Sequence, residues 1–364
     1  MKVQQLILRN FRNYDVLELS PAAGINILLG NNAQGKTNII EALYYSALGR
    51  SHRTSSDEEM IRWEQDGGAI QVLFSRMGVE QELRIQFLPS KGKSCFHNGH
   101  KIKAKDIVGM FNAVLFAPED LMLVKGAPVL RRRFLDGEIS QASPYYYQQL
   151  LSYNRILGQR NHLLKKIRER KAKEELLDSW DPQLAKAAAS IVGKRLEAVK
   201  KLAMLANLMH RKITANQENL QVQYQLSGIG EGDLSPAAYE KALLEGRRQD
   251  VFRGSTGVGP HRDDLTLLVN NVALRSFGSQ GQQRTGALSL KLAELEYIKS
   301  ETGEYPVLLL DDVMSELDES RREHLLAFIK DRIQTFISAT DEAYFPKNFN
   351  SCYYQVVQGR VTKA

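Results

Sequence analysis

The sequence contains few of the residues that stabilise small secreted proteins or bind structural metals. Its 364 residues include only two cysteines, Cys95 and Cys352, and no Cys-x-x-Cys or Cys/His cluster. Two cysteines cannot form a disulfide framework, and the missing ligand cluster argues against a structural zinc site. Such low cysteine usage is typical of a reducing compartment.

Long hydrophobic segments are also missing. No apolar run approaches the roughly 20 residues that span a bilayer. Residues 1–15 carry charges throughout and lack the uninterrupted apolar core of a signal peptide. We therefore expect a soluble, cytoplasmic protein that does not contact a membrane.

The composition supports a globular protein with a basic surface. Hydrophobic residues make up 43% of the chain, which suffices for a sizeable core. Lys and Arg outnumber Asp and Glu by 49 to 42, for a net charge of +7. This balance favours a polyanionic partner such as nucleic acid, although a merely basic soluble protein would have the same charge.

A phosphate-binding motif lies near the start of the chain. Residues 30–37 read GNNAQGKT and match the pattern Gly-x-x-x-x-Gly-Lys-[Ser/Thr] in full. An apolar run precedes the motif and an apolar-periodic segment ending at Gly49 follows it, which predicts a strand, a loop and a helix. Backbone N–H groups would wrap phosphates, Lys36 would add charge, and the Thr37 hydroxyl would hold Mg²⁺. A chance match is the alternative, and the flanking segments disfavour it.

A second apolar run ends in paired acids. Residues 307–310 predict a buried parallel strand, and Asp311 and Asp312 follow it at the edge where open α/β sheets bind ligands. We expect Asp311 to hold Mg²⁺ through water and Asp312 to polarise the attacking water. An ordinary acidic turn after a strand is the alternative.

The segment between these motifs is helical and basic. Residues 154–175 contain eight Lys or Arg and three Glu. Beyond Pro182, apolar residues recur every three or four positions, which predicts an amphipathic helix of about thirty residues. The basic stretch is a candidate surface for DNA phosphates, with a solvated helix face as the alternative.

Two further stretches attract attention by their composition. Residues 277–296 read as a glycine- and glutamine-rich loop entering a helix, which is half of a phosphate site because it lacks lysine. His261, Asp263 and Asp264 form a poor metal cage, and a structural hydrogen-bonding role is the better interpretation of this histidine.

The order of these motifs resembles the head domain of ABC-type ATPases, and within them the SMC/RecF group. Residues 279–282 resemble the Ser-Gly-Gly-Gln part of the family's signature loop, with Gln280 in place of the first glycine, and residues 315–318 resemble its D-loop. An SMC protein would insert hundreds of heptad-patterned residues between the motifs, and none are present. Five more stretches resemble the RecF family specifically: residues 10–21, 49–54, 117–136, 259–265 and 278–285.

The resemblance implies an α/β fold, an ABC-type P-loop ATPase head with a mixed sheet and helices, and a second, mostly helical lobe. Lobe one would comprise residues 1–122 and 300–364. Lobe two would comprise residues 123–299 and carry the signature loop. In this family the signature loop caps the nucleotide of the opposite subunit, and the D-loop crosses the dimer interface.

The resemblance also implies a function in DNA repair, recombination and replication and in the SOS response. It implies a slow, DNA-stimulated ATPase that uses ATP and Mg²⁺ as a conformational switch and forms a homodimer in the ATP state. The dimer would bind double-stranded DNA near gap junctions and, with a RecR-like partner, help to load RecA.

The candidate site residues fall into groups by role. The nucleotide-binding candidates are Gly30, Asn31, Asn32, Ala33, Gln34, Gly35, Lys36, Thr37, Asn38, Arg12 and Asn13. Lys36 and Asp312 are the catalytic candidates, and Thr37 and Asp311 the metal ligands. The signature loop comprises Ser279, Gln280, Gly281, Gln282 and Gln283, and the D-loop contributes Ser315 and Asp318. The DNA-binding candidates are Arg50, His52, Arg53, Arg155, Arg160, Lys165, Lys166 and Arg168.

Two departures from the wider ABC pattern bear on function. Asp312 stands where most ABC enzymes have glutamate, and its shorter side chain is consistent with slow turnover. No histidine follows the strand predicted near residue 335, so Thr340 or Asp341 would have to serve as the switch residue. These departures disfavour a transporter's nucleotide-binding subunit, and a P-loop phosphotransferase would leave the signature and D-loop matches unexplained.

Overall fold

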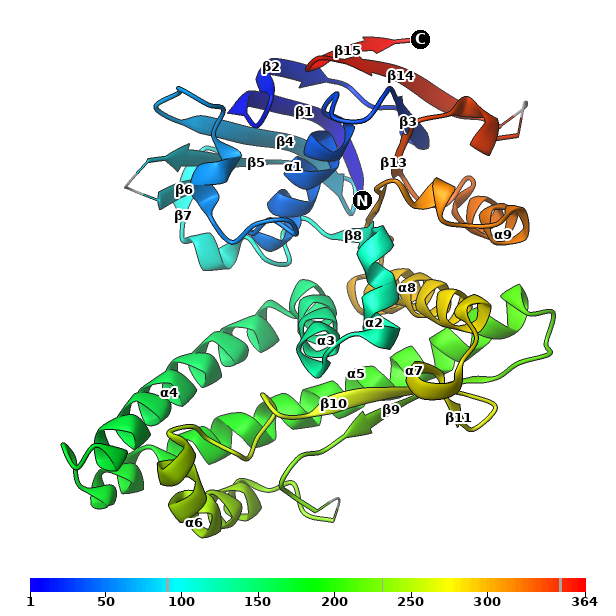
Figure 1. Cartoon of the computed structure of the whole chain (residues 1–364). Helices are drawn as coiled ribbons and strands as arrows, with labels where there is room; N and C mark the ends of the chain where they lie inside the picture. The colour runs from blue at the N-terminus through cyan, green and yellow to red at the C-terminus, as the bar shows by residue number, and fades with distance from the viewer. Residues whose placement is uncertain (90–91, 231, 347–348) are drawn as a thin grey trace. The chain divides into compact units, whose positions relative to one another are not determined.

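The computed structural model describes residues 1–89, 92–230, 232–346 and 349–364. The chain forms two compact units, Met1–Asp120 with Lys291–Ala364, and Leu121–Leu290 (Figure 1). The second unit boundary falls inside a continuous helix, α8 (Gln280–Thr302). The lobe limits expected at residues 122 and 300 stay a prediction. Helical periodicity in the sequence gives no signal for a boundary that falls within one helix.

The first unit contains an antiparallel sheet of six strands in the order β2-β1-β4-β5-β6-β7. Along its longer strands, buried side chains alternate with half-buried or exposed ones, as expected for a sheet with one solvated face. The strands are β1 (Lys2–Phe11), β2 (Tyr14–Leu19), β4 (Gly68–Arg76), β5 (Val79–Leu88), β6 (Gly92–His97) and β7 (His100–Ile102).

A second, mixed sheet has the order β15-β14-β3-β13-β12-β8, with only β15 antiparallel to its neighbour. The strands predicted before the phosphate loop, before the paired acids and near residue 335 are confirmed as β3, β12 and β13. All residues of these three strands are buried, which fits parallel strands covered on both faces. The bounds are β3 (Ile25–Leu29), β8 (Ala113–Phe116), β12 (Val307–Leu310), β13 (Thr335–Ala339), β14 (Ser351–Val357) and β15 (Arg360–Lys363).

Helix α1 (Lys36–Leu48) follows the phosphate loop and lies between the two sheets, where it contacts β4 on one side and β8, β12 and β13 on the other. Ten of its 13 residues are buried, which such a position requires. The predicted helix end at Gly49 is confirmed: Gly49 caps the helix with a φ of 64°, and its N–H donates to Tyr45 O at 2.7 Å. Helix α9 (Glu319–Ile329) completes this unit together with the end of α8.

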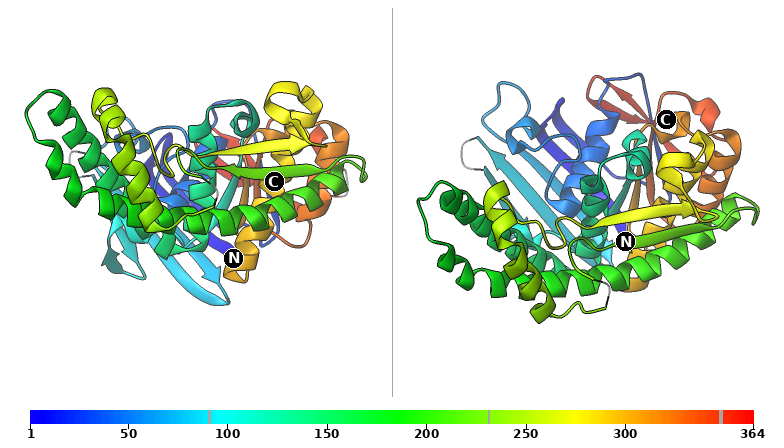
Figure 2. Two further views of the ribbon diagram at one scale, coloured as in Figure 1. Left: turned by 90° about the horizontal axis from the view of Figure 1, so that it is seen from below. Right: turned by 60° about the horizontal axis from the view of Figure 1, so that its bottom comes forward.

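The second unit is mostly helical and includes a three-stranded sheet in the order β11-β10-β9. The helix expected beyond Pro182 is confirmed as α5, which has 33 residues and runs along the sheet (Figures 1 and 2). Prolines in the first turns of α3, α4, α5 and α6 mark the helix starts. The helices are α2 (Met122–Lys125), α3 (Pro128–Ala142), α4 (Pro144–Arg168), α5 (Asp181–Ile213), α6 (Pro236–Arg253) and α7 (Leu274–Phe277); the strands are β9 (Leu220–Gln225), β10 (Asp264–Val269) and β11 (Val272–Ala273).

Short 3-10 helices connect these elements at Asp57–Met60, Ala104–Asp106, Pro118–Leu121, Glu174–Ser179, Val313–Ser315 and Glu342–Tyr344. Across the described ranges, none of the helices combines the length and the apolar character needed to cross a membrane.

Candidate nucleotide-binding site

The phosphate loop joins the end of β3 to the start of α1, as the motif predicts. Lys36 opens the helix, and its ammonium group donates to Gly30 O at 2.7 Å and to Asn31 O at 2.9 Å. The side chain is buried, and this burial lowers the pKa of Lys36 despite the opposing effect of Asp311 and Asp312. The two carbonyl groups thus hold the lysine ammonium group at the start of the phosphate loop.

The acids after β12 meet the start of α1. Thr37 Oγ1 donates to Asp311 Oδ1 at 2.9 Å, although the two residues are 274 positions apart. Ser338 on β13 donates to the same carboxylate oxygen at 2.8 Å. Burial raises the pKa of Asp311 even though both hydroxyl donors favour the charged form. A hydroxyl and a carboxylate are thus adjacent at the carboxyl edge of the parallel sheet.

Asp312 occupies a special backbone conformation. Its φ is 51°, in the left-handed region that non-glycine residues rarely adopt, and its N–H donates to Ser338 Oγ at 2.8 Å. Such outliers concentrate at functional sites, where surrounding contacts hold them. The D-loop continues from here: Ser315 Oγ donates to Asp312 O at 2.9 Å, and Asp318 caps α9 by accepting from the Arg321 N–H.

The turn between β1 and β2 lies beside the phosphate loop. Asn13 donates through Nδ2 to Gln34 O at 3.0 Å and accepts from Asn38 Nδ2 at 2.7 Å. Arg12 instead forms a bidentate pair with Glu41 on α1, at 2.9 and 2.7 Å. Burial alone would raise the pKa of Glu41, but the hydrogen bonds from Arg12 and Ser51 and the nearby arginines lower it overall.

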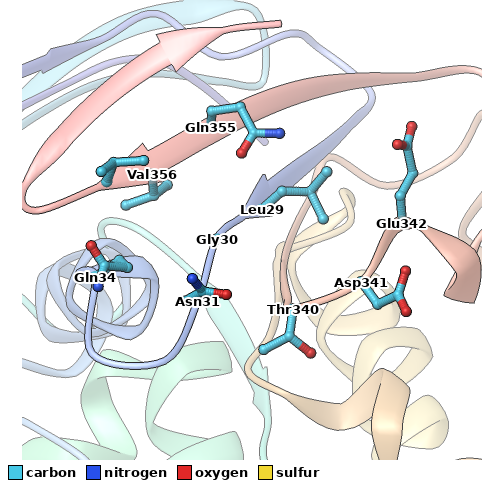
Figure 3. A pocket seen from close by; sticks show the side chains of 10 residues that line it. Leu29, Gly30, Asn31, Gln34, Thr340, Asp341, Glu342, Gln355 and Val356 are labelled. Atoms are coloured by element: carbon cyan, nitrogen blue, oxygen red, sulfur yellow. The ribbon is translucent and has the colours of Figure 1, made fainter.

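A pocket of about 400 Å³ lies at the carboxyl edge of β3, β13 and β14. Figure 3 shows that it is lined by the phosphate loop, by the segment after β13 and by β14. The two candidate switch residues line it and are exposed; Asp341 accepts from the Ala343 N–H at 2.8 Å. Its lining residues are Leu29, Gly30, Asn31, Gln34, Thr340, Asp341, Glu342, Gln355, Val356 and Val357.

The signature segment differs from the open loop that the sequence predicted. Helix α8 begins at Gln280, so only Gly278 and Ser279 separate it from α7. Ser279 and Gln282 form a reciprocal cap: Ser279 N donates to Gln282 Oε1 at 3.0 Å, and Gln282 N donates to Ser279 Oγ at 3.2 Å. The prediction of an open loop beyond Ser279 was wrong, because this capping box starts the helix at Gln280, before Gly281.

The signature glutamines also differ from one another. Gln282 donates through Nε2 to Glu218 Oε1 at 2.8 Å, and Gln283 is buried and donates to Leu274 O at 3.0 Å. The prediction that Gln283 belongs to the signature loop that caps a nucleotide is therefore corrected, because its buried amide donates to a carbonyl of its own unit. Ser279 and Gln280 are exposed, and Gly281 is half-buried.

Comparison with known proteins identifies the family. The model of the RecF/RecN/SMC N-terminal domain matches residues 2–362. The DNA replication and repair protein RecF of Bacillus cereus strain B4264 is 45% identical over 345 residues, which covers 93% of this chain and 92% of the relative. RecF of Clostridium beijerinckii is 44% identical over 339 residues, with 93% and 91% covered. This chain belongs to the RecF family.

Solved structures agree with this assignment. The recombination mediator protein RecF in the RecFOR pathway has been solved with ATP; this chain matches it with a TM-score of 0.92 and 36% identity, over 100% of this chain and 97% of the other. The RecF-ATPrS structure gives 0.92 and 35%, over 99% and 97%. An Smc head bound to ScpA gives 0.58 at 14% identity, over 100% and 97%, and shares the fold. The predicted ABC-type head is confirmed, and the transporter and phosphotransferase alternatives are set aside.

The DNA-binding candidates of this RecF chain lie in two places. In the first unit, Arg50 is exposed, and Arg53 donates to Asn38 Oδ1 at 3.0 Å beside the phosphate loop. His52 packs edge-on against Tyr44, and burial lowers its pKa, which disfavours the charged form that would attract phosphates. In the second unit, four exposed cations lie along α4: Arg155, Lys165, Lys166 and Arg168.

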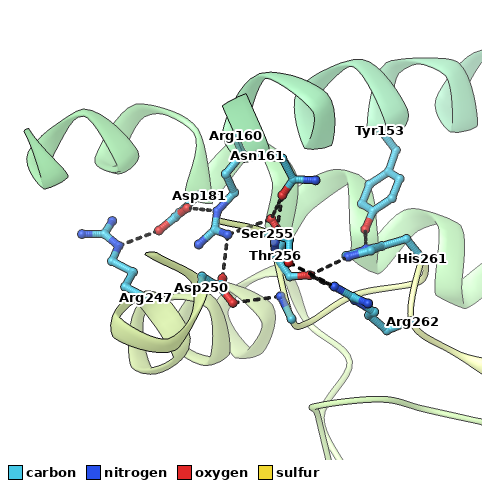
Figure 4. Close-up of polar contacts among 11 residues, drawn as sticks. Tyr153, Arg160, Asn161, Asp181, Arg247, Asp250, Ser255, Thr256, His261 and Arg262 are labelled. Carbon is cyan, nitrogen blue, oxygen red and sulfur yellow. Dashed lines mark hydrogen bonds and ion pairs between the residues drawn. The ribbon is translucent and has the colours of Figure 1, made fainter. Parts of the chain in front are cut away.

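Arg160 is misplaced in that group. It is fully buried, with Nε 2.7 Å from Asp181 Oδ1 and Nη1 2.7 Å from Asp250 Oδ2 (Figure 4). Nη1 also donates to Thr256 Oγ1 at 2.8 Å. This arginine joins α4, α5 and α6 in the interior, so it does not present its charge to DNA.

The stretch at residues 259–265 has a structural explanation of the same kind. His261 faces Tyr153 Oη at 2.6 Å through Nδ1 and Thr256 O at 3.0 Å through Nε2 (Figure 4). Asp263 accepts from Tyr224 Oη at 2.6 Å, and Asp264 pairs with Arg131. Each side chain is engaged with protein groups, and the described residues contain no metal-binding cluster of three or more His, Cys, Asp or Glu.

Several site residues escaped sequence reasoning. Glu41, which lies in α1, pairs with Arg12 and Arg53. Ser338 accepts from the N–H of Asp312 and donates to the carboxylate of Asp311. Both are buried polar residues, Glu41 within α1 and Ser338 within β13, and a polar residue at a position expected in the core is the signal that identifies them. The contribution of β14 to the pocket leaves no comparable signal in the sequence.

Proposed function

We propose that this RecF chain is an ATP-driven switch in DNA repair, recombination and replication. It binds ATP and Mg²⁺ at residues 30–38, forms a homodimer in the ATP state and holds double-stranded DNA near single-strand gaps in the cytoplasm. With a RecR-like partner it helps to load RecA. The observation that carries the proposal is the contact between Thr37 and Asp311, which brings the phosphate loop and the paired acids into one site.

The phosphate loop supplies the binding step. N–H groups at the start of α1 and the adjacent positive end of the helix dipole attract phosphate oxygens. Lys36 adds a positive charge that the phosphates would share with the carbonyls of Gly30 and Asn31. The relatives solved with ATP support a nucleotide as the ligand.

The residues present fit a magnesium ion. Thr37 and Asp311 offer a hydroxyl and a carboxylate oxygen 2.9 Å apart, and Mg²⁺ prefers oxygen ligands from one or two side chains together with phosphates. A bound Mg²⁺ would neutralise charge that develops on the phosphate oxygens. Thr37 would contribute its hydroxyl directly and Asp311 its carboxylate through water.

Asp312 serves hydrolysis. Its carboxylate accepts a proton of the attacking water, while its backbone is held by Ser338. A carboxylate one methylene shorter than that of glutamate reaches this water less well, which supports slow turnover. Slow hydrolysis suits a switch, because the ATP state then lasts long enough to act on DNA.

The signature segment completes the site across a dimer. Ser279 and Gln280 are exposed at the start of α8, where the positive end of the helix dipole attracts an anion without a lysine. The missing positive charge is Lys36 of a second copy. ATP therefore binds between two chains and stabilises the closed dimer.

A DNA-binding titration tests this function. Duplex, single-stranded and gapped DNA are compared with ATP or ADP at two salt concentrations. We expect ATP-dependent binding that prefers duplex or gapped DNA and weakens steeply with salt, because phosphate contacts release counterions. Equal binding with ATP and ADP, or no binding to any DNA, would contradict the proposal.

A further inference from the structure

We propose that the turn between β14 and β15, residues Gln358 and Gly359, is a positioning element of the nucleotide site. Its two N–H groups hold Gln34 and thereby fix the orientation of the phosphate loop. This inference rests on the proposed function and adds to it a part of the chain that carries no recognised motif.

A loop that binds an anion through its N–H groups must turn its carbonyls away and supply them with donors. The carbonyls of Gly30 and Asn31 receive the Lys36 ammonium group. The Gly35 carbonyl receives the hydroxyl of buried Tyr14 at 3.1 Å. The carbonyl at the centre of the loop, that of Gln34, is held from outside the motif.

Gln34 is held at both of its oxygens. Its backbone oxygen accepts from Gly359 N at 3.1 Å and from Asn13 Nδ2 at 3.0 Å. Its side-chain Oε1 accepts from Gln358 N at 2.7 Å. Two consecutive turn N–H groups therefore grip one loop residue across 324 positions of sequence.

The geometry of the turn produces this grip. Gln358 and Gly359 have φ values of 47° and 73°, as in a two-residue hairpin turn with both central residues left-handed. Consecutive N–H groups in such turns point to one side and bind anions or carbonyl oxygens.

The contact is also sterically close. A Cβ on Gly359 would lie 2.8 Å from Asn13 O, and a Cβ on Gly30 would lie 2.3 Å from Val356 O. Both glycines let the hairpin and the phosphate loop approach each other. The first glycine of the motif is thus required by β14 as well as by the loop.

Another hairpin of the same unit shows that the turn type does not itself demand this contact. Asn98 and Gly99, between β6 and β7, have φ values of 48° and 79°, and a Cβ on Gly99 would meet nothing within 4 Å. Gly99 is therefore a matched control for Gly359: both carry the same backbone strain on substitution, but only Gly359 touches the phosphate loop.

The test compares ATP affinity and thermal midpoint for the unsubstituted chain and the variants Gly359→Ala and Gly99→Ala, with Mg²⁺ present. Both variants should lose stability, because each places a side chain at positive φ, and Gly359→Ala should lose more because its Cβ would also lie 2.8 Å from Asn13 O. Only Gly359→Ala should bind ATP more weakly, by about tenfold, since moving the hairpin away from Asn13 loosens the loop at a cost of about 1.4 kcal/mol. Equal ATP affinity in the two variants would overturn the inference.

A second variant distinguishes the loss of the hydrogen bonds to Gln34 from general damage to the hairpin. Gln34→Met removes the side-chain acceptor at similar size and should weaken ATP binding roughly threefold to tenfold. Because both changes break the same grip, the double variant Gln34→Met/Gly359→Ala should bind no more weakly than Gly359→Ala alone. Fully additive losses would contradict the grip. An unsubstituted chain that fails to bind ATP would overturn the proposed function, and this inference with it.

Discussion

Replacing Arg160 by methionine tests the interior of the second unit. The change removes the positive charge from between Asp181 and Asp250, both of which are buried. Asp181 keeps Arg247 at 2.7 Å, and the Asp250 carboxylate keeps the Gly257 N–H at 2.9 Å. Removing one partner from such a buried ion pair costs about 3–5 kcal/mol, because an uncompensated charge stays behind.

Urea denaturation measures this loss. The unfolding midpoint of Arg160→Met should fall by about 1–2 M relative to the unsubstituted chain. Arg155→Met is the control, since Arg155 lies exposed on the same helix and its loss should change stability by less than about 0.5 kcal/mol.

DNA binding distinguishes the two roles of these arginines. Losing a phosphate contact reduces the slope of log affinity against log salt by about 0.9, whereas a buried arginine contributes no such contact. Under conditions where it stays folded, Arg160→Met should keep the unsubstituted slope. An Arg160→Met chain as stable as the Arg155→Met control, but with weaker DNA binding and a smaller slope, would refute this reasoning.

Three further predictions concern the nucleotide site and the role of His261. Lys36→Met should abolish ATP binding in a direct titration, because the loop loses its only lysine; retained affinity would contradict the site. Ser279→Arg should leave ATP binding by the monomer intact but block the mass increase with ATP, since a large cation would occupy the exposed start of α8; an unchanged dimer would contradict the signature role. Burial lowers the pKa of His261 to about 4, so the folded chain keeps it neutral and its contribution to stability, roughly 3 kcal/mol, is present above the unfolded pKa of about 6.5 and is lost as the pH falls toward 4. His261→Gln should flatten the stability profile in that pH window, and an unchanged profile would contradict the assignment.

The sequence predicted those parts of the site that are contiguous or periodic. Residues 30–37 and their flanking strand and helix are local patterns, and the apolar run before Asp311 reads directly as a buried strand. The length of α5 follows from its apolar periodicity. Local physical chemistry determines these features, so one chain suffices to find them.

The wrong predictions for Arg160 and for the start of α8 overlooked patterns that the sequence contains. Arg160 shares a helix face with Tyr153, Ile156 and Leu164, all of them buried, so its spacing already indicated an interior position. The spacing of Ser279 and Gln282 is that of a capping box, which predicts a helix start rather than a loop.

The remaining features could not be predicted because they join residues far apart in the chain. The contact of Gln34 with the turn at Gln358 and the support of Asp311 by Ser338 depend on which strands become neighbours in the sheet. Sequence periodicity assigns strands but does not order them, so these contacts required the structure.

We propose that ATP, bound between Lys36 of one copy and the signature segment of another, holds the dimer together. Light scattering of the unsubstituted chain with ATP or ADP measures this most directly. We expect the apparent mass to double from that of a 41.1 kDa monomer with ATP and to stay that of the monomer with ADP. A mass that does not depend on the nucleotide would contradict it.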